Sequence, residues 1–252
     1  MTAIIEARNL AKAFGGVRAV NDVSFEVEPG RLLAMIGPNG AGKTTCFNLL
    51  NGQLVPDSGS VLLGGGELVG LSPRQIWRLG VGRTFQITAT FGSMTVLENV
   101  QMTLLSYHRR LRALMPLVRD LYVEEAMALL ERVGMADQAE RACAILAYGD
   151  LKRVELAVAL GNEPRLLLMD EPTAGMAPRE RIELMALTAE IVRERNISVL
   201  FTEHDMDVVF AHADEVIVLN RGTLIAQGSP AEVRSDSNVQ EIYLGSGSTY
   251  AA

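Results

Sequence analysis

Three short runs of consecutive hydrophobic residues mark the chain, and each is followed at once by glycine or polar residues: Leu32 to Ile36, Leu166 to Met169, and Val199 to Phe201. Unbroken runs of this length are typical of strands buried on both faces of a parallel sheet. Ahead of the first run, Val23, Phe25 and Val27 alternate with polar residues, which predicts a strand with one exposed face. We therefore expect an antiparallel β layer followed by a parallel sheet.

Helical signals lie mainly between the first and second runs. They predict three helices, from Thr95 toward Tyr107, from Val123 to Val133, and from about Leu151 to Leu160. Thr95 to Glu98 reads as a capping box at the first helix, and Gly134 closes the second. Later signals predict a helix from Pro178 to about Arg195, a hairpin turn at Asn220-Arg221-Gly222, and a short helix capped by Ser229-Pro230-Ala231-Glu232.

The octapeptide between the first hydrophobic run and the next helical segment reads Gly37-Pro38-Asn39-Gly40-Ala41-Gly42-Lys43-Thr44. Its glycines permit backbone conformations closed to other residues, so successive N–H groups can converge on a phosphate at a helix N-terminus. Lys43 would reach the β- and γ-phosphates, and the Thr44 hydroxyl would bind Mg²⁺. The segment Thr45 to Leu50, ended by Gly52, supplies the helix that such a loop requires. An ordinary glycine-rich turn is the alternative.

Acidic and histidine side chains follow the other two hydrophobic runs. Because the carboxyl ends of parallel strands meet at one edge of a sheet, these side chains should lie beside the phosphate loop. Asp170 can then hold Mg²⁺ and Glu171 can polarise an attacking water, the alternative being two solvated acids at a strand end. We interpret His204 as catalytic because it stands just past the third run, and His108 and His212 as structural.

The order of these elements resembles that of the ABC-transporter ATPases over essentially the whole sequence. By that resemblance Gln86, after Gly82-Arg83-Thr84-Phe85, would be the Q-loop glutamine, and Leu146 to Asp150 the signature element. Ala174 to Ala177 would be the D-loop and His204 the switch histidine. The phosphate loop is weakly specific by itself, whereas the five elements in sequence are highly specific.

The resemblance implies ATP and Mg²⁺ as cofactors and gives a role to each matching residue. Catalysis would rest on Glu171, His204 and Gln86, and Mg²⁺ would be held by Thr44, Gln86 and Asp170. The nucleotide would contact Phe14, Gly37, Pro38, Asn39, Gly40, Ala41, Gly42, Lys43, Thr44, Thr45, Ala147, Tyr148, Gly149 and Asp150. Two such subunits, identical or paired with a related ATPase, would sandwich two ATP molecules, each between the phosphate loop of one subunit and the signature helix of the other.

The resemblance also implies a fold and a division of the chain. The fold would be an α/β P-loop NTPase with a RecA-like core, an N-terminal antiparallel β layer and an inserted α-helical subdomain, forming a single domain over residues 1–252. Residues 1–86 and 161–228 would form the nucleotide-binding core and β layer, residues 87–160 the helical insert with the signature element, and residues 229–252 a C-terminal helical tail.

Two departures from the pattern of the superfamily concern closure of such a dimer. The signature usually reads Leu-Ser-Gly-Gly-Gln, whereas Ala147 lacks the serine hydroxyl and Tyr148 replaces a glycine. The helix N-terminus and the Gly149 N–H remain as phosphate donors, so we expect a weakened closure contact. Ala177 stands where the D-loop usually has aspartate, which puts the usual link across the dimer in question.

The Leu-Ala-Tyr-Gly variant, together with Glu203 to Met206 and the closing Tyr243-Leu244-Gly245, resembles the subfamily that serves branched-chain amino acid importers. Related members serve urea, amides or other hydrophobic amino acids, and a lipopolysaccharide-export ATPase has a similar signature. The resemblance implies as partners the transmembrane permease subunits, a second ATPase subunit and, indirectly, an extracytoplasmic solute-binding protein. The implied location is the cytoplasmic face of the cell membrane.

Composition agrees with this interpretation. At 252 residues and 48% hydrophobic, the chain can bury one large core. No hydrophobic run approaches the ~20 residues of a membrane span, and Met1-Thr2-Ala3 begins no signal peptide, so membrane work would require a partner. A net charge of −7 argues against a nucleic-acid partner, and we interpret His108-Arg109-Arg110 with Arg112 as a solvated face. Cys46 and Cys143 lack metal-site spacing and suggest a reducing cytoplasm.

Two other functional classes share the phosphate loop. A soluble ABC protein of chromosome maintenance or translation carries a long coiled-coil insertion or a second ATPase copy, and this sequence has neither. A GTPase should show an Asn-Lys-x-Asp guanine reader, which the sequence lacks, and a kinase does not need the element Leu146 to Asp150. The ATPase of a membrane importer is therefore the prediction.

Three side chains carry two interpretations each. Phe14 either stacks on adenine, as in the resembling family, or packs in the core at the end of the first strand. Cys46, close to Lys43 in the first helical turn, is either a reactive thiolate or a buried, inert thiol. Phe91, ahead of the helix at Thr95, either anchors a permease helix or packs inside the helical insert.

Overall fold

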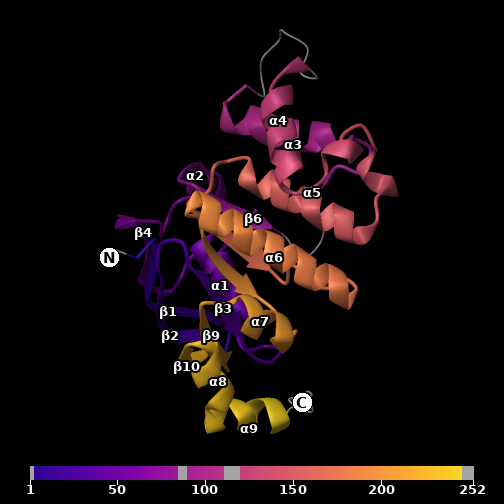
Figure 1. The fold of residues 1–252 in the computed structure, drawn as a ribbon. Helices are drawn as coiled ribbons and strands as arrows, with labels where there is room; N and C mark the ends of the chain where they lie inside the picture. The colour runs from indigo at the N-terminus through magenta and orange to yellow at the C-terminus, as the bar shows by residue number, and fades with distance from the viewer. Residues whose placement is uncertain (1–2, 85–89, 111–119, 246–252) are drawn as a thin grey trace.

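Two β-sheets and a set of helices make up the fold of the computed structural model, which describes residues 3–84, 90–110 and 120–245 (Figure 1). The smaller sheet has the order β2-β1-β4-β5 and is antiparallel. Its strands are β1 (Ile5–Phe14), β2 (Val17–Val27), β4 (Ser58–Leu63) and β5 (Gly66–Glu67). Val23, Phe25 and Val27 of β2 are buried while the residues between them are exposed, so the predicted antiparallel β layer is confirmed.

The larger sheet has the order β10-β9-β3-β8-β7-β6 and contains all three hydrophobic runs. Its strands are β3 (Leu32–Ile36), β6 (Val81–Thr84), β7 (Leu166–Asp170), β8 (Ser198–Thr202), β9 (Glu215–Asn220) and β10 (Thr223–Gly228). Pairing is parallel from β9 to β6, and β10 joins antiparallel at the edge. Every residue of β3, β7 and β8 is buried, as an unbroken hydrophobic run predicts.

The helices outside the insert are α1 (Lys43–Leu50), α2 (Pro73–Arg78), α6 (Pro178–Arg195), α7 (Met206–His212), α8 (Pro230–Ser235) and α9 (Ser237–Gly245). The predicted bounds of α6 are confirmed, whereas α1 begins two residues earlier than predicted because the loop turns into the helix at Gly42. The predicted hairpin joins β9 to β10 through Arg221 and Gly222, whose φ angles are 49° and 81°.

Three helices form a separate layer at the end of the molecule away from α8 and α9 (Figure 1). They are α3 (Val96–Tyr107), α4 (Val123–Arg132) and α5 (Tyr148–Leu160). The capping box of α3 is confirmed, since the Glu98 N–H donates to Thr95 Oγ1 and the Thr95 N–H donates to Glu98 Oε2. The predicted start of α5 at Leu151 is wrong by three residues because Ala147, without a side-chain cap, already stands at the N-cap.

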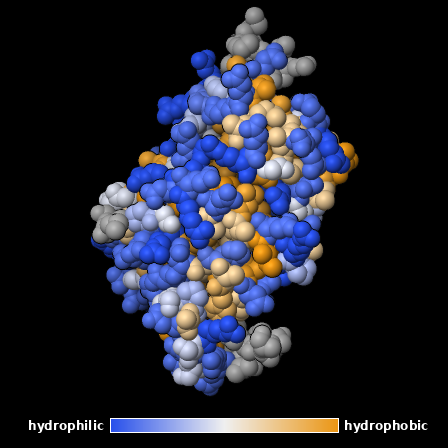
Figure 2. All heavy atoms as spheres, in the orientation of Figure 1, coloured by the Kyte–Doolittle hydropathy of each residue, from blue (hydrophilic) through white to orange (hydrophobic). Residues whose placement is uncertain are grey.

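The hydrophobic core divides at the larger sheet, and β3 contributes to both halves. Leu32, Ala34 and Ile36 belong to the hydrophobic cluster that extends to α6 and the layer of α3, α4 and α5, while Leu33 and Met35 belong to the cluster shared with the β layer and α1. The period of two along a strand causes this division. The face shown in Figure 2 is mostly hydrophilic, with hydrophobic residues gathered around α5 and α6. Within the described residues, no helix combines the length and hydrophobicity needed to cross a bilayer.

Cys46 lies inside the half of the core that α1 shares with the β layer. Its side chain is fully buried, and burial raises the pKa of the thiol to about 12. Desolvation therefore outweighs the helix dipole and the neighbouring Lys43, which would favour the thiolate. The structure favours the inert interpretation of Cys46. Cys143 is likewise buried, with its thiol pKa raised by desolvation.

Candidate functional site

The carboxyl ends of three adjacent parallel strands define the candidate site. In the register of the sheet, Thr202 at the end of β8 pairs with Met35 of β3 on one side and with Asp170 of β7 on the other. The phosphate-loop segment that follows β3, the acidic pair that ends β7 and the segment after β8 therefore meet at one edge. This edge is the usual place for ligands in open α/β sheets.

Close backbone approaches fix the shape of the loop from Gly37 to Gly42. Gly37 and Gly42 have φ angles of 152° and 106°. A Cβ atom at Gly37 would lie 2.2 Å from the carbonyl oxygen of Leu219, and one at Gly42 would lie 2.3 Å from that of Ala19. Helix α1 begins directly after Gly42, so its first N–H groups point toward the loop and can bind an anion.

The ammonium group of Lys43 is turned back onto the loop. Its Nζ donates to the carbonyl oxygen of Gly37 at 2.6 Å and to that of Pro38 at 3.3 Å. Burial lowers the pKa of Lys43, and the negative charges of Glu171 and Asp170 oppose that shift. The two carboxylates therefore lie close enough to help keep this buried amine charged.

The Asp170 carboxylate is held by two neighbours. Its Oδ1 accepts a hydrogen bond from Thr202 Oγ1 at 2.9 Å, and its Oδ2 lies 3.6 Å from an Nη of Arg83. Arg83 also donates to Asn48 of α1 and to Gln53, both at 3.0 Å. A guanidinium group thus links the helix after the phosphate loop to the acidic end of β7.

Glu171 and His204 form a contact across the ends of β7 and β8. His204 Nε2 lies 2.8 Å from Glu171 Oε1. The Glu171 N–H donates to Thr202 Oγ1 at 3.0 Å, and the φ angle of Glu171 is +48°, in the left-handed region that glutamate rarely adopts. The His204 side chain is 49% exposed and that of Glu171 is 18% exposed. A carboxylate and an imidazole in contact at an open edge can exchange or position protons.

Sequence reasoning missed three residues of this edge: Arg83, Thr202, and Glu203, whose carboxylate accepts a hydrogen bond from the Thr173 N–H at 2.8 Å. Thr202 and Glu203 directly precede His204 and follow the third hydrophobic run, so the sequence alone could have placed both residues at the strand end. Arg83 lies in β6, whose sequence Val-Gly-Arg-Thr has too little hydrophobic character to mark a strand. Gln86 lies outside the described residues, and so does Arg112.

The signature residues lie in the helical insert. Ala147 and Tyr148 are exposed, and the Tyr148 ring packs on Gly175, where a Cβ atom would lie 3.3 Å from Tyr148 Cε1. Asp150 accepts a hydrogen bond from the Gln138 amide at 3.1 Å. The Tyr148 contact joins the insert to the segment that follows Glu171, whereas the Asp150 hydrogen bond lies within the insert.

Phe14 ends β1 and is 48% exposed, so its interpretation as a core residue is wrong. The ammonium group of Lys12 lies 5.9 Å from the centroid of its ring. His108 lies stacked on Tyr122 and contacts Glu125 at 3.1 Å, and burial lowers the pKa of His212. Both of these histidines lie in structural surroundings, as expected.

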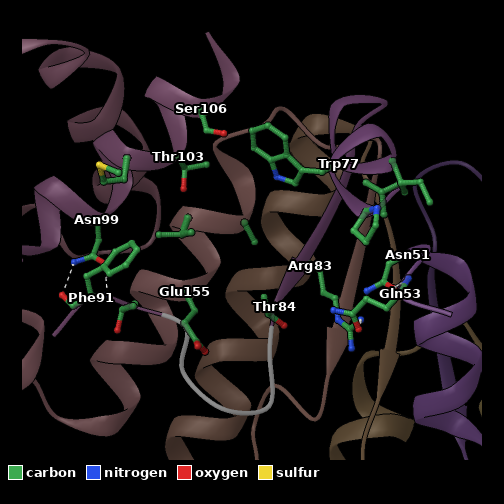
Figure 3. A pocket seen from close by; sticks show the side chains of 17 residues that line it. Asn51, Gln53, Trp77, Arg83, Thr84, Phe91, Asn99, Thr103, Ser106 and Glu155 are labelled. Carbon is green, nitrogen blue, oxygen red and sulfur yellow. Dashed lines mark hydrogen bonds between the residues drawn. The ribbon is translucent and has the colours of Figure 1, made fainter. Parts of the chain in front are cut away.

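A cavity of about 450 Å³ lies between the larger sheet with α2 and the helical insert (Figure 3). Trp77 and Arg83 line its core side, and Met102 and Glu155 line its insert side. Phe91 also lines it and is 56% exposed as a residue, although its backbone is tied to Asn99 by hydrogen bonds of 2.7 and 3.1 Å. The interpretation of Phe91 as a residue packed inside the insert is therefore wrong.

Comparison with known proteins gives consistent relatives. A family described as ABC transporter matches residues 20–174, and one described as branched-chain amino acid ATP-binding cassette transporter matches residues 223–248. The high-affinity branched-chain amino acid transport ATP-binding proteins LivG of Escherichia coli (strain K12) and BraF of Pseudomonas aeruginosa are each 40% identical, over 96% of this chain and 98% of theirs. The crystal structure of the ADP conformation of an ATP-binding cassette of an ABC transporter is 32% identical, with a TM-score of 0.85, over 97% of this chain and 100% of that one.

The buried Thr202 hydroxyl gives a prediction about stability. Thr202→Val keeps the shape of the side chain but removes the hydrogen-bond donor to Asp170, so the free energy of unfolding should fall by about 1–3 kcal/mol. Urea titration of the purified protein measures this fall. Thr188→Val is the control, because the Thr188 hydroxyl donates only to the Leu184 carbonyl within α6. An equal loss of unfolding free energy in the two variants would contradict a special contribution of the hydrogen bond between Thr202 and Asp170.

Proposed function

This chain belongs to the ABC transporter family of ATP-binding proteins, and from that premise we propose that it is the ATP-hydrolysing subunit of an importer for branched-chain amino acids. The contact between Glu171 and His204 beside the phosphate loop carries the proposal of hydrolysis. The names of the relatives and the match over residues 223–248 support the solute class. Urea and amide importers and a lipopolysaccharide exporter are the alternatives, and the same relatives favour branched-chain amino acids over them.

The loop from Gly37 to Thr44 is the proposed site for the phosphates of ATP, with Thr45 beside it. Lys43 would exchange its hydrogen bonds with the loop carbonyls for charge-assisted bonds to the β- and γ-phosphates. Asn39, Gly40 and Thr44 are exposed at this edge and so can be reached by a ligand. Phe14 would cover the face of adenine, because its ring is half exposed at the end of β1.

The oxygen groups near the loop suit Mg²⁺. Magnesium in nucleotide sites is held by one or two protein oxygens together with phosphates and waters, so a dense cluster of ligands is not required. Thr44 and Asp170 offer a hydroxyl and a carboxylate, and the family resemblance of the sequence adds Gln86 as a third ligand. When bound, the ion would neutralise charge that develops on the phosphate oxygens.

Glu171 is the proposed general base. It would accept a proton from the attacking water as the water oxygen bonds to the γ-phosphorus and the bond to the ADP leaving group breaks. His204 holds the Glu171 carboxylate at 2.8 Å, and its exposed ring can turn to the γ-phosphate when ATP is present. Gln86 would position the water or the ion.

Closure of a dimer would complete each site. Ala147, Tyr148, Gly149 and Asp150 of one subunit would cover the nucleotide bound to the other, using the N-terminus of α5 as the phosphate donor. Exposed Ile145, Tyr148 and Ile182 give this face the hydrophobic contacts that an interface needs.

The cavity between core and insert is the proposed seat of a permease helix. Its walls are hydrophobic with a few polar groups, and Phe91 projects an exposed ring into it (Figure 3). Through this contact the subunit would lie at the cytoplasmic face of the membrane, and a solute-binding protein would act on the far side of the same permease. No nucleic-acid partner is proposed.

The first test of this function replaces the proposed base. Glu171→Gln should lower ATP turnover by about 10²- to 10⁴-fold, the range for a lost general base, with the affinity for ATP preserved. Steady-state phosphate release and calorimetry measure the two quantities. ATP should also trap the variant as a closed dimer, visible by sedimentation. Near-normal hydrolysis would remove Glu171 from this role.

A second test concerns recognition of the base. A stacked side chain contacts the face of the base and not its hydrogen-bonding edge, where adenine and guanine differ. The native protein should therefore discriminate weakly between ATP and GTP. Phe14→Ala should weaken both by about 1–3 kcal/mol, and Val55→Ala, at another exposed hydrophobic position, should weaken neither. A strong native preference for ATP that survives Phe14→Ala would show that another residue reads the base.

A third test concerns the permease. Phe91→Ser should leave the melting temperature and ATP affinity of the isolated subunit nearly unchanged, because the ring is exposed, while weakening copurification with the permease. Val55→Ser is the control, since Val55 is 58% exposed and lies outside the cavity lining. Early melting of Phe91→Ser, or normal copurification, would withdraw the coupling role.

A further inference from the structure

A third carboxylate, Glu203, is buried beside Asp170 and Glu171 and has no part in the steps above. Its side chain is 3% exposed and accepts three hydrogen bonds. Oε1 accepts from the Thr173 N–H at 2.8 Å and from Thr173 Oγ1 at 2.7 Å, and Oε2 accepts from the His204 N–H at 3.2 Å. The carboxylate therefore joins the segment after β8 to the segment after β7.

Consecutive residues at the end of β8 hold consecutive residues at the end of β7. Thr202 binds the Asp170 side chain and the Glu171 N–H, Glu203 binds Thr173, and the His204 side chain contacts Glu171. The turn from Asp170 to Thr173 is thus fixed from one side by a single tripeptide.

This turn needs external support for two physical reasons. Glu171 has a φ angle of +48°, which a non-glycine residue keeps only when its surroundings hold it there. Pro172 has no N–H group, so the next backbone donor after Glu171 is Thr173, and its N–H goes to Glu203. Without Glu203, the residues after β8 would hold this turn only through Asp170 and Glu171, and no longer through Thr173.

We propose that Glu203 is a positioning residue for Glu171, which keeps the turn from Asp170 to Thr173 in the conformation that aims the Glu171 carboxylate at His204 and the attacking water. The inference rests on the proposed function, in which Glu171 is the base. The same turn leads into Ala174 to Ala177, so Glu203 also fixes the start of that segment.

Replacement of the Glu203 carboxylate by an amide tests the three hydrogen bonds that Glu203 accepts. A carboxylate accepts at both oxygens, whereas a glutamine amide accepts at one end and donates at the other. Glu203→Gln can keep both bonds from Thr173 only by turning its NH₂ group toward the His204 N–H, so it loses one bond. Glu203→Ala loses all three. Thr173→Val removes one of the same bonds from the other side.

Turnover and ATP affinity of the purified full-length protein test the proposal. Displacement of a catalytic group by about 1 Å can cost about 10²-fold, so Glu203→Ala should lower kcat by about that factor and Glu203→Gln by about tenfold, with ATP affinity within about twofold of the native value. Thr173→Val should resemble Glu203→Gln, and adding Thr173→Val to Glu203→Ala should lower kcat little further, because Glu203→Ala already removes the same bond. If Glu203→Gln and Thr173→Val both turn over ATP as fast as the native protein, the proposal is overturned, even if Glu203→Ala fails to fold.

A double variant separates positioning of Glu171 from a general structural role. In a Glu171→Gln background, Glu203→Gln should change the residual turnover by less than about threefold, because the group it positions is already gone. A full further tenfold loss would overturn the proposal. If Glu171→Gln alone hydrolyses ATP normally, the proposed base fails; if it is slow while Glu203→Gln is normal, only the positioning role fails.

Asp214→Asn is the matched control. The Asp214 carboxylate also accepts from a backbone N–H, that of Leu32 at 2.8 Å, but at the opposite end of β3 in the same sheet. It should leave kcat within about twofold of the native value, since it lies away from the strand ends that carry Glu171. A loss as large as that of Glu203→Gln would show that any such change disturbs turnover, and would overturn the assignment to Glu203.

Discussion

The parallel pairing of β3, β8 and β7 is the constraint on which the rest of the structure depends. It places the phosphate loop, Asp170 and Thr202 at one edge, because parallel strands in register end together. Burial of all three strands on both faces fixes that register, since a slip by one residue would exchange the two halves of the core. The chemistry of the site is thus a consequence of core packing.

The site has a second layer of polar contacts that orient its charged groups. Thr202 and Arg83 hold Asp170, and Glu203 holds the turn that carries Glu171. Such contacts matter because a buried charge without partners costs several kcal/mol, and because small displacements of a reacting group are expensive. The strained φ angle of Glu171 is tolerated within this set of contacts.

The helical insert is tied to the same edge through its own helix α5. Tyr148 packs on Gly175, and the Lys152 ammonium lies 5.5 Å from the centroid of the Tyr148 ring. Lys152 is also paired with Glu155 at 2.9 Å, and Glu155 lines the cavity. Tyr148, which replaces the usual glycine of the signature, therefore stands in a chain of contacts between the cavity and the segment after Glu171.

Much of the fold follows from the sequence, because unbroken hydrophobic runs, capping boxes and glycine turns are local signals. β3, β7, β8, α3 and α6 were predictable for that reason. β6 was not, because the strand character of Val81 to Thr84 comes from pairing with β7 rather than from its own residues. The contact of Glu203 with Thr173 joins segments that lie 30 residues apart in the chain, which no local pattern encodes.

The central claim is that the phosphate loop and the ends of β7 and β8 act as one nucleotide site. Hydrogen exchange of the native protein, with and without ATP and Mg²⁺, tests it most directly, since exchange reports local opening segment by segment. The account predicts that ATP slows exchange together in residues 37–45, in residues 171–176 and in residues 202–205. Slowing confined to residues 37–45, with the other two segments unchanged, would contradict it.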